Sequence, residues 1–344
     1  MTVVLIDSPL ESALVERIAA VDERIELLYD PLVVPAPRYM GDIAGDFAPD
    51  ADRWTELLGR AEVLFGLPGA SPQALVEAIA GAPHLRWVQA RNAGAGQQVA
   101  QALDLDRAAL ERVRVCTASG THAGPLAEFT ILGLLAFTKE LRRMQRDKTR
   151  RYWPPNEQPN GELRGQTLLV IGAGAIGVEI ARLAKAFGMT VLGTKRDVSE
   201  PVDHVDELRP IEELPALAGR ADAAVCVLPG TDATRGLIDA SFFAALKPGA
   251  VFVNVGRGTA VDEAALVDAL RDGTLRGAAL DVFESEPLPS DSPLWELENV
   301  LLSPHDTARV AAEDERQVEL FCDNLRRDLA GEPLRNVVDL ELLY

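Results

Sequence analysis

The stretch that decides the fold is 167–187, TLLVIGAGAIGVEIARLAKAF. After Thr167 comes an apolar run, 168–171, typical of a strand that is buried on both faces. Glycines follow at positions 172, 174 and 177, and apolar side chains then recur at helical spacing. A second apolar run, 190–194, comes next. The stretch therefore predicts a strand, a tight turn, a helix and a second strand, which together form the βαβ unit of a parallel sheet.

The three glycines have the spacing GxGxxG and stand after a strand, at the start of a helix, as a dinucleotide-binding turn requires. Gly172 permits the tight turn, and Gly177 allows the helix to pack closely against the strand. Gly174 allows backbone N–H groups to approach a pyrophosphate. The alternative is a set of turn glycines without a ligand, but nothing structural demands all three at this spacing. We therefore predict that NADP or NAD binds here.

The end of the second strand bears on which dinucleotide binds. NAD-preferring proteins usually place Asp or Glu there for the ribose hydroxyls, whereas this chain has Lys195 and Arg196. The two cations favour NADP, because they can hold its 2′-phosphate. The alternative is that both cations are solvated, and that Asp197 or a main-chain group holds the ribose of NAD.

Composition bounds the class of protein. A length of 344 residues favours two domains, and hydrophobic residues at 47% with charged residues at 25% are typical of globular chains. The 34 basic and 53 acidic residues give a net charge of -19, which repels nucleic acids and anionic lipid surfaces. We therefore expect neither as a partner. An anionic ligand would need cationic side chains in its own site.

Three further features bear on metal content and location. The three cysteines are widely spaced and form no CxxC pair, which argues against a disulfide framework or a zinc site. The N-terminus lacks the basic start and long apolar region of a signal peptide. The longest apolar stretch, 131–137, is far shorter than the roughly 20 residues of a membrane span. We expect no metal and a cytoplasmic location.

Short β-branched runs alternate with amphipathic stretches in the first part of the chain, which predicts more βαβ units. The predicted strands are 3–6, 25–28, 61–65 and 85–88, and the predicted helices are 11–20 and 71–79. Between them, the stretch 31–49 is rich in Pro, Gly and Asp and predicts a long loop.

Further along, one long helix is predicted over 125–144, and the Pro-rich stretch 152–159 after it marks a domain boundary. A second alternating series runs from 167 to 304, and a last helix is predicted over 308–329. The pattern predicts a domain, 123–306, inserted in another domain made of 1–122 and 307–344.

The later predicted strands end in unusual residues. The predicted strands 250–254, 278–280 and 300–302 lead into Arg257, Asp281 and His305, and Glu286 follows Asp281 closely. In an open parallel sheet, ligands bind just beyond the carboxyl ends of the strands. We therefore expect these four side chains to converge on one cleft.

Their chemistry suits hydride transfer to or from C2 of a small 2-keto or 2-hydroxy acid. Arg257 can bind the carboxylate through its planar guanidinium and polarise the neighbouring carbonyl. His305 can protonate the carbonyl oxygen during reduction and accept the proton during oxidation. Glu286 can pair with the imidazole, fix its tautomer and favour its protonated form. A lone histidine is usually structural, so the other three histidines are given no role.

At these residues the sequence resembles the D-isomer-specific 2-hydroxy-acid dehydrogenases, which include glyoxylate/hydroxypyruvate reductases and phosphoglycerate dehydrogenases. The resemblance covers nearly the whole chain and is most specific over 253–263, 280–288 and 303–305. It implies an α/β fold in which a Rossmann dinucleotide-binding domain is inserted in a flavodoxin-like substrate domain, with a cleft at their junction. It also implies a D-specific oxidoreductase that forms a homodimer.

The resemblance also implies further contacts to the dinucleotide. Ala175 and Ile176 match residues that meet the pyrophosphate, and Pro229 matches a residue on the adenosine side. Val255 and Asp281 match residues near the nicotinamide carboxamide.

For the substrate, the loop 93–96 resembles one whose backbone N–H groups hold the acid's carboxylate, so Ala93 and Gly94 are predicted contacts. Many members have an acidic residue just after this loop, whereas this chain has Gln97 and Gln98, which leaves the pocket unassigned in detail. Trp153 resembles an aromatic residue that some glyoxylate-reducing members present to the partner's active site. Plain dimer packing is the equal alternative.

Two rival interpretations share the fold. Formate dehydrogenase pairs its histidine with Gln, where this chain has Glu286. A corepressor that senses dinucleotides can retain the acid–base residues, but this chain has no extended disordered tail or basic region. The sequence names neither the keto acid nor the physiological direction.

Overall fold

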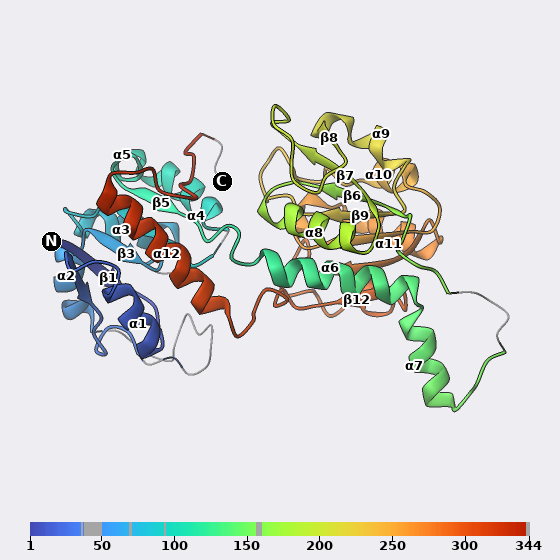
Figure 1. Cartoon of the computed structure of the whole chain (residues 1–344), viewed down its shortest axis with the longest axis horizontal. Coiled ribbons are helices and arrows are strands. Elements are labelled where there is room, and N and C mark those ends of the chain that lie inside the picture. Colours follow the sequence, from blue (N-terminus) through green and yellow to red (C-terminus); the bar gives the residue numbers. More distant parts are fainter. Residues whose placement is uncertain (36, 38–49, 69–70, 93, 156–159, 342–344) are drawn as a thin grey trace. The chain divides into compact units, whose positions relative to one another are not determined.

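The computed structural model of the chain describes residues 1–35, 37, 50–68, 71–92, 94–155 and 160–341. The chain divides into two compact units, shown in Figure 1. Unit 1 holds both chain ends, Met1–His122 and Arg309–Tyr344, and unit 2 is the insertion Ala123–Ala308. The assignment of substrate and cofactor roles to these units is still a prediction.

Unit 1 is built on a five-stranded parallel sheet with the order β2-β1-β3-β4-β5. This is the flavodoxin-like order, in which the direction of winding changes between β1 and β3. The strands are β1 (Thr2–Ile6), β2 (Ile25–Leu28), β3 (Val63–Phe65), β4 (Trp87–Gln89) and β5 (Arg114–Cys116).

Helices cover both faces of this sheet. Its strand residues alternate between two hydrophobic clusters, so that Val4 and Ile6 lie in one cluster and Leu5 in the other. One cluster includes side chains of α1 (Ser12–Ala19) and α12 (Glu313–Ala330). The other includes side chains of α2 (Ala51–Arg60), α3 (Pro72–Gly81), α4 (Ala95–Leu105) and α5 (Arg107–Arg112). Burial on both sides explains why β1 reads as a continuous apolar run.

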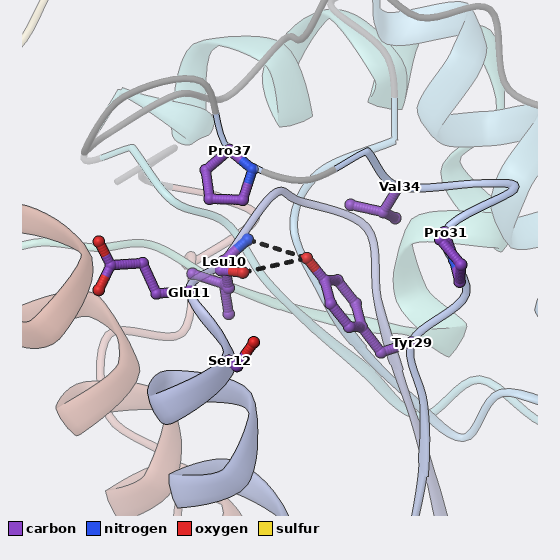
Figure 2. A pocket seen from close by; sticks show the side chains of 7 residues that line it. All are labelled: Leu10, Glu11, Ser12, Tyr29, Pro31, Val34 and Pro37. Atoms are coloured by element: carbon purple, nitrogen blue, oxygen red, sulfur yellow. Dashed lines mark hydrogen bonds between the residues drawn. The ribbon is translucent and has the colours of Figure 1, made fainter.

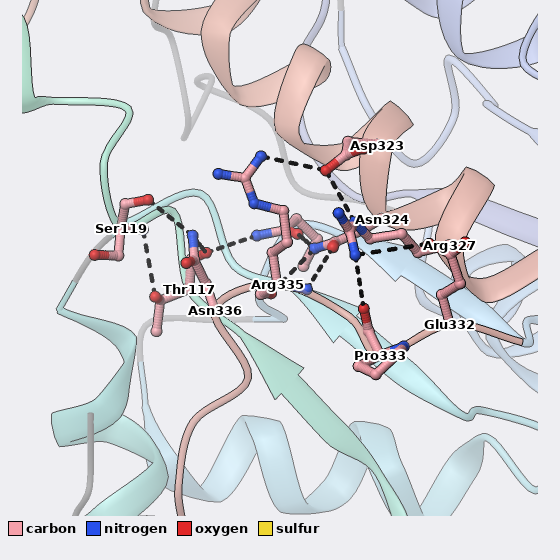
Figure 3. A network of polar contacts seen from close by, with 10 residues as sticks. Thr117, Ser119, Asp323, Asn324, Arg327, Glu332, Pro333, Arg335 and Asn336 are labelled. Atoms are coloured by element: carbon pink, nitrogen blue, oxygen red, sulfur yellow. Dashed lines mark hydrogen bonds and ion pairs between the residues drawn. The ribbon is translucent and has the colours of Figure 1, made fainter. Parts of the chain in front are cut away.

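Polar contacts fasten the C-terminal segment to unit 1, as Figure 3 shows. The side-chain oxygen of Asn324, on α12, accepts a hydrogen bond from the backbone N–H of Arg335 at 2.8 Å. The side chain of Asn336 donates to the carbonyl oxygen of Ser119 at 2.8 Å. The last described residues therefore belong to the folded body of unit 1.

Unit 2 is built on a seven-stranded parallel sheet with the order β12-β11-β10-β9-β6-β7-β8, which is the Rossmann order with one added strand. Its strands are β6 (Thr167–Ile171), β7 (Thr190–Lys195), β8 (Glu207–Pro210), β9 (Ala223–Cys226), β10 (Ala250–Asn254), β11 (Leu275–Leu280) and β12 (Val300–Leu302). The winding changes between β6 and β9, directly beside the glycine turn.

Both faces of the second sheet are also covered. Side chains of α6 (Ala123–Thr138) and α8 (Ala175–Ala186) pack in one cluster with alternate strand residues. Side chains of α9 (Leu214–Ala218), α10 (Ala240–Ala245) and α11 (Glu263–Arg271) pack in the other. Single 3-10 turns are η1 (Ile211–Glu213), η2 (Gly258–Ala260) and η3 (Pro293–Trp295).

The long helix predicted over 125–144 is wrong, because the chain forms two helices there. The first, α6, is rich in buried apolar residues, whereas α7 (Leu141–Arg150) buries none. Glu140 between them has a φ angle of 53°, in the left-handed region that ends a helix. The apolar spacing continues through the break in Leu141 and Met144, but both side chains are exposed.

Other boundaries differ by a few residues. The strand predicted over 61–65 begins at Val63, and the last helix begins at Glu313 rather than at 308. Within the described ranges, no helix is long and apolar enough to cross a bilayer.

Candidate active site

The predicted dinucleotide turn joins β6 to α8. Gly172 has a φ angle of 104°, and its N–H and that of Ala173 donate to the carbonyl oxygen of Thr194 at 3.2 and 2.8 Å. A side chain at Gly177 would place its Cβ 2.5 Å from the carbonyl oxygen of Gly172. The turn itself therefore requires Gly172 and Gly177.

Gly174 differs from these two glycines, because a Cβ there would meet no heavy atom within 4 Å. It is the N-cap of α8, and no side chain caps the helix. Ala175 beside it is exposed and Ile176 is half-buried. Open space before an uncapped helix N-terminus suits a pyrophosphate, which accepts hydrogen bonds from backbone N–H groups. The residues present thus fit a dinucleotide.

At the end of β7, Lys195 and Arg196 are both exposed. Asp197 accepts a hydrogen bond from the backbone N–H of Ser199 at 2.9 Å. Hydrogen bonds from Ser199 lower the pKa of Asp197, and the charge of Lys195 adds to this effect. Two cations and one carboxylate therefore stand together at this strand end.

The loop after β10 presents Arg257. The buried side chain of Asn254 shapes this loop, because its oxygen accepts from the N–H of Gly256 at 3.1 Å and its amide donates to the carbonyl oxygen of Arg257 at 3.3 Å. The Arg257 guanidinium donates to the carbonyl oxygen of Gly256 at 2.8 Å. Burial lowers the pKa of Arg257, and the charge of Glu286 opposes this shift. Within the described part of the chain Arg257 forms no ion pair, so its charge is available to an anionic ligand.

Glu286 and His305 form the predicted pair. The Nδ1 atom of His305 lies 2.7 Å from the Oε2 atom of Glu286, whose other carboxylate oxygen accepts from the backbone N–H of Phe283 at 3.0 Å. A carboxylate only accepts hydrogen bonds, so the imidazole carries its proton on Nδ1. The Nε2 atom is then left for a ligand.

Gly258 allows the loops of Arg257 and Glu286 to approach each other. A Cβ at Gly258 would lie 1.9 Å from the carbonyl carbon and oxygen of Phe283. Any side chain at this position would therefore push the two loops apart.

Asp281, after β11, is 2% exposed. Its carboxylate accepts hydrogen bonds from the hydroxyl groups of Ser303 at 2.8 Å and Thr307 at 2.6 Å. No role was predicted for Asn254, Ser303 or Thr307. Asn254 and Ser303 could have been recognised as site residues, because each is a polar residue at the end of an apolar strand.

Other predicted contacts lie at neighbouring strand ends of unit 2. Val255 is buried, and its N–H donates to the carbonyl oxygen of Cys226, on β9, at 3.1 Å. Pro229 is exposed, and its carbonyl oxygen accepts from the hydroxyl of Thr234 at 2.6 Å.

The predicted substrate loop belongs to unit 1. Ala93 lies outside the described residues, and Gly94 is the N-cap of α4. Just before them, buried Arg91 forms an ion pair with Asp314, on α12. Trp153, in unit 2, is 92% exposed.

Figure 2 shows a pocket of about 350 Å³ elsewhere in unit 1, where the Tyr29 hydroxyl bonds both the N–H and the carbonyl oxygen of Leu10. Its remaining lining residues are Glu11, Ser12, Pro31, Val34 and Pro37. It contains none of the predicted site residues. No cluster of three or more potential metal ligands occurs among the described residues.

Residues 131–307, just over half of the chain, match the family described as D-isomer specific 2-hydroxyacid dehydrogenase, NAD binding domain. The chain belongs to the D-isomer specific 2-hydroxyacid dehydrogenases. The predicted family is thus confirmed, and so is the class of cofactor, NADP or NAD. The choice between these two is still a prediction.

Curated relatives of this dehydrogenase family extend the match. A glyoxylate reductase of Aeropyrum pernix is 34% identical over 70% of this chain and 74% of its own length. A D-3-phosphoglycerate dehydrogenase of Methanocaldococcus jannaschii is 33% identical over 69% of this chain. The match covers 45% of that protein, and the chain spans about half the length of the phosphoglycerate dehydrogenases it matches.

Among solved structures, a D-isomer specific 2-hydroxyacid dehydrogenase from Xanthobacter autotrophicus, in complex with NADPH and MES, has a TM-score of 0.76 and 28% identity. It covers 100% of this chain and 99% of its own. The predicted two-domain α/β fold with a Rossmann domain is therefore confirmed.

Proposed function

We propose that this dehydrogenase interconverts a small 2-keto acid and the corresponding D-2-hydroxy acid, with NADP preferred over NAD. The observation that carries the proposal is the pair of His305 and Glu286, 2.7 Å apart, on loops that follow neighbouring strands of the dinucleotide-binding sheet. Arg257 follows the next strand, and the charge of Glu286 acts on it.

The bound nicotinamide supplies or accepts the hydride. Arg257 binds the carboxylate of the acid, because it is a partly buried cation without a carboxylate partner among the described residues. His305 holds a proton on Nε2 for the C2 oxygen during reduction and takes it back during oxidation. Glu286 keeps Nδ1 protonated, so that Nε2 faces the reaction in one tautomer.

The substrate class is a small 2-hydroxy or 2-keto acid. The relatives named above act, by their names, on glyoxylate and on a phosphoglycerate, which share a carboxylate beside the reacting carbon. We assign Ala93 and Gly94 to that carboxylate together with Arg257. Homodimerisation, with Trp153 at or near the interface, and a cytoplasmic location belong to the same proposal.

The dinucleotide is held by the turn that contains Gly172, Gly174 and Gly177, with Ala175 and Ile176 at the pyrophosphate. Pro229 lies on the adenosine side, and Val255 and Asp281 lie near the carboxamide. Exposed Lys195 and Arg196 hold the 2′-phosphate of NADP.

The first test follows reduced-nicotinamide absorbance with glyoxylate, hydroxypyruvate, pyruvate and longer 2-keto acids, each with NADPH and with NADH. We expect oxidation with at least one acid and faster turnover with NADPH. Replacing Lys195 and Arg196 by Ala should remove the preference for NADPH. The control is Arg271→Ala, at an exposed position at the end of α11. An unchanged preference in the double variant would refute the assignment of these cations.

The second test separates chemistry from binding. His305→Ala and Arg257→Ala should lose most turnover, while each still binds dinucleotide, measured by fluorescence titration. If His305→Ala kept near-native rates with chemistry rate-limiting, the acid–base assignment would be wrong. A wild-type protein that binds dinucleotide but reduces none of these acids would point first to a different keto acid and second to the dinucleotide-sensing interpretation.

A further inference from the structure

His305 has an uncommon backbone conformation. Its φ angle is 56°, in the left-handed region that few residues other than glycine adopt. It lies in the short turn 303–307 after β12, and its side chain is 45% exposed. Packing of the ring against the protein therefore does little to hold this conformation.

The carboxylate of Asp281 holds both ends of the turn. Its Oδ1 atom accepts hydrogen bonds from the Ser303 hydroxyl at 2.8 Å and from the Thr307 N–H at 3.3 Å. Its Oδ2 atom accepts from the Thr307 hydroxyl at 2.6 Å. These bonds reach the residues two before and two after His305, so the left-handed residue stands between two fixed points.

Asp281 is itself fixed to the sheet. Its N–H donates to the carbonyl oxygen of Asn254, on β10, at 3.0 Å, and the N–H of Ser303 donates to the carbonyl oxygen of Leu280 at 2.9 Å. A buried carboxylate is unfavourable unless hydrogen bonds replace its water, and the turn supplies three. The carboxylate and the turn thus stabilise each other.

We propose that Asp281 is a positioning residue for His305, an inference that rests on the catalytic role proposed above for His305. Glu286, five positions after Asp281, holds the imidazole ring through Nδ1. Asp281 holds the backbone that carries the ring. The segment 281–286 thus fixes the orientation of Nε2 from two directions, and the role of Asp281 goes beyond its predicted contact with the nicotinamide carboxamide.

The test changes the partners of Asp281 rather than Asp281 itself, so that any contact to the dinucleotide is left intact. Thr307→Val removes one hydroxyl at nearly constant shape, Thr307→Ser keeps it, and Ser303→Ala removes the other. We expect Thr307→Val and Ser303→Ala each to lower kcat about tenfold or more, since each loses a hydrogen bond to a buried charge. The Kd of the dinucleotide should change by less than about twofold, and Thr307→Ser should keep near-native kcat.

The matched control is Asp306→Asn. The Asp306 carboxylate is beside His305 and lies 2.9 Å from the Ser303 hydroxyl, where it competes with Asp281 for the one hydroxyl proton, but unlike Asp281 it is exposed. We expect Asp306→Asn to keep kcat within about threefold of the wild-type value. The inference is overturned if Thr307→Val keeps native kcat. It is also overturned if the fall in kcat of Thr307→Val is matched by an equal rise in the Kd of the dinucleotide.

A readout independent of turnover separates this inference from the proposed function. The chain has four histidines, so the imidazole NMR signal of His305 can be assigned by its absence in His305→Ala. In Thr307→Val this signal should move toward its position in Glu286→Gln, and in Thr307→Ser it should stay. A signal that stays in Thr307→Val refutes the positioning role even if the protein reduces no keto acid. If the signal moves in Thr307→Val but the protein has no reductase activity, the positioning role is supported and only the proposed reaction is refuted.

Discussion

Replacing Gly174 by Ala should weaken dinucleotide binding without harming the fold. The new Cβ would meet no protein atom within 4 Å, and the backbone there, with φ -88° and ψ -161°, is open to any residue. The alanine makes the unfolded chain less flexible, which stabilises the variant by about 0.4 to 1 kcal/mol. Alanine is a poorer N-cap than glycine, which offsets roughly 0.5 to 1 kcal/mol. The free energy of unfolding should therefore stay within about 1 kcal/mol of the wild-type value.

The same methyl group would project into the space assigned to the pyrophosphate. Loss of one or two N–H hydrogen bonds to a charged oxygen corresponds to roughly 1.5 to 3 kcal/mol, so the Kd of the dinucleotide should rise at least about tenfold. Calorimetric titration with NADPH measures the Kd, and urea unfolding measures stability.

Gly177→Ala is the matched control, three positions along the chain. Its Cβ would lie 2.5 Å from a backbone oxygen and 3.0 Å from the Val170 side chain, so this variant should lose about 1 to 3 kcal/mol of stability. If Gly174→Ala bound NADPH with native affinity, the pyrophosphate would not lie against this turn, and the assignment of the site would fail.

Two further perturbations test other parts of the molecule. Gly258→Ala should destabilise unit 2 by about 3 kcal/mol or more, because its Cβ would overlap the Phe283 carbonyl. Urea unfolding measures this loss, with Gly219→Ala as the control, because a Cβ at Gly219 would have an ordinary 3.6 Å contact. Equal stabilities of the two variants would contradict the prediction. Burial raises the pKa of Asp7 to about 7, so the folded protein binds a proton that the unfolded chain releases near pH 4, and stability falls as pH rises between these values. Asp7→Asn should therefore reduce the loss of stability between pH 5 and pH 8 by about 1 to 2.5 kcal/mol, since about two pH units separate pH 5 from the folded pKa and the exposed part of the residue lowers the effect. Asp197→Asn is the control and should leave the change of stability between pH 5 and pH 8 as in the wild type, because the pKa of Asp197 is lowered and lies below this range. Equal pH profiles of stability for Asp7→Asn and the wild type would refute the argument.

Sequence alone predicts the strands that are buried on both faces, because they have no polar side and read as continuous apolar runs. The fully buried stretch 250–254 is found with the bounds that the structure has, and so is 300–302, an edge strand whose residues are all apolar. The strand β8 was not predicted, since it contains Glu207 and Arg209 and so does not read as an apolar run. The three-residue β5 is too short to show a period.

The break between α6 and α7 could not be predicted for a different reason. No Gly or Pro marks it, and the apolar spacing runs on through Leu141. Burial of apolar side chains ends with α6, since α7 buries none, and burial is a tertiary property.

Some residues of the candidate site could be predicted from the sequence, and others could not. Arg257, Glu286 and His305 could be named because charged groups after apolar strands have few structural explanations. The supporting roles of Ser303 and Thr307 depend on the register of β11 against β12, which brings Asp281 to them. Hydroxyl residues after strands are common, so their identity alone does not indicate these contacts.

The division of the chain has a consequence for how such a protein can change. Arg257, Glu286, His305 and the dinucleotide turn are all encoded between Ala123 and Ala308, whereas Gly94 is encoded outside that segment. On the proposed assignment of Gly94 to the substrate, mutations in unit 1 would alter which acid is accepted while the proton-transfer pair and the cofactor turn stay intact. On the same assignment, exchange of unit 1 between relatives would offer a route to new selectivity in which the reaction itself is inherited unchanged.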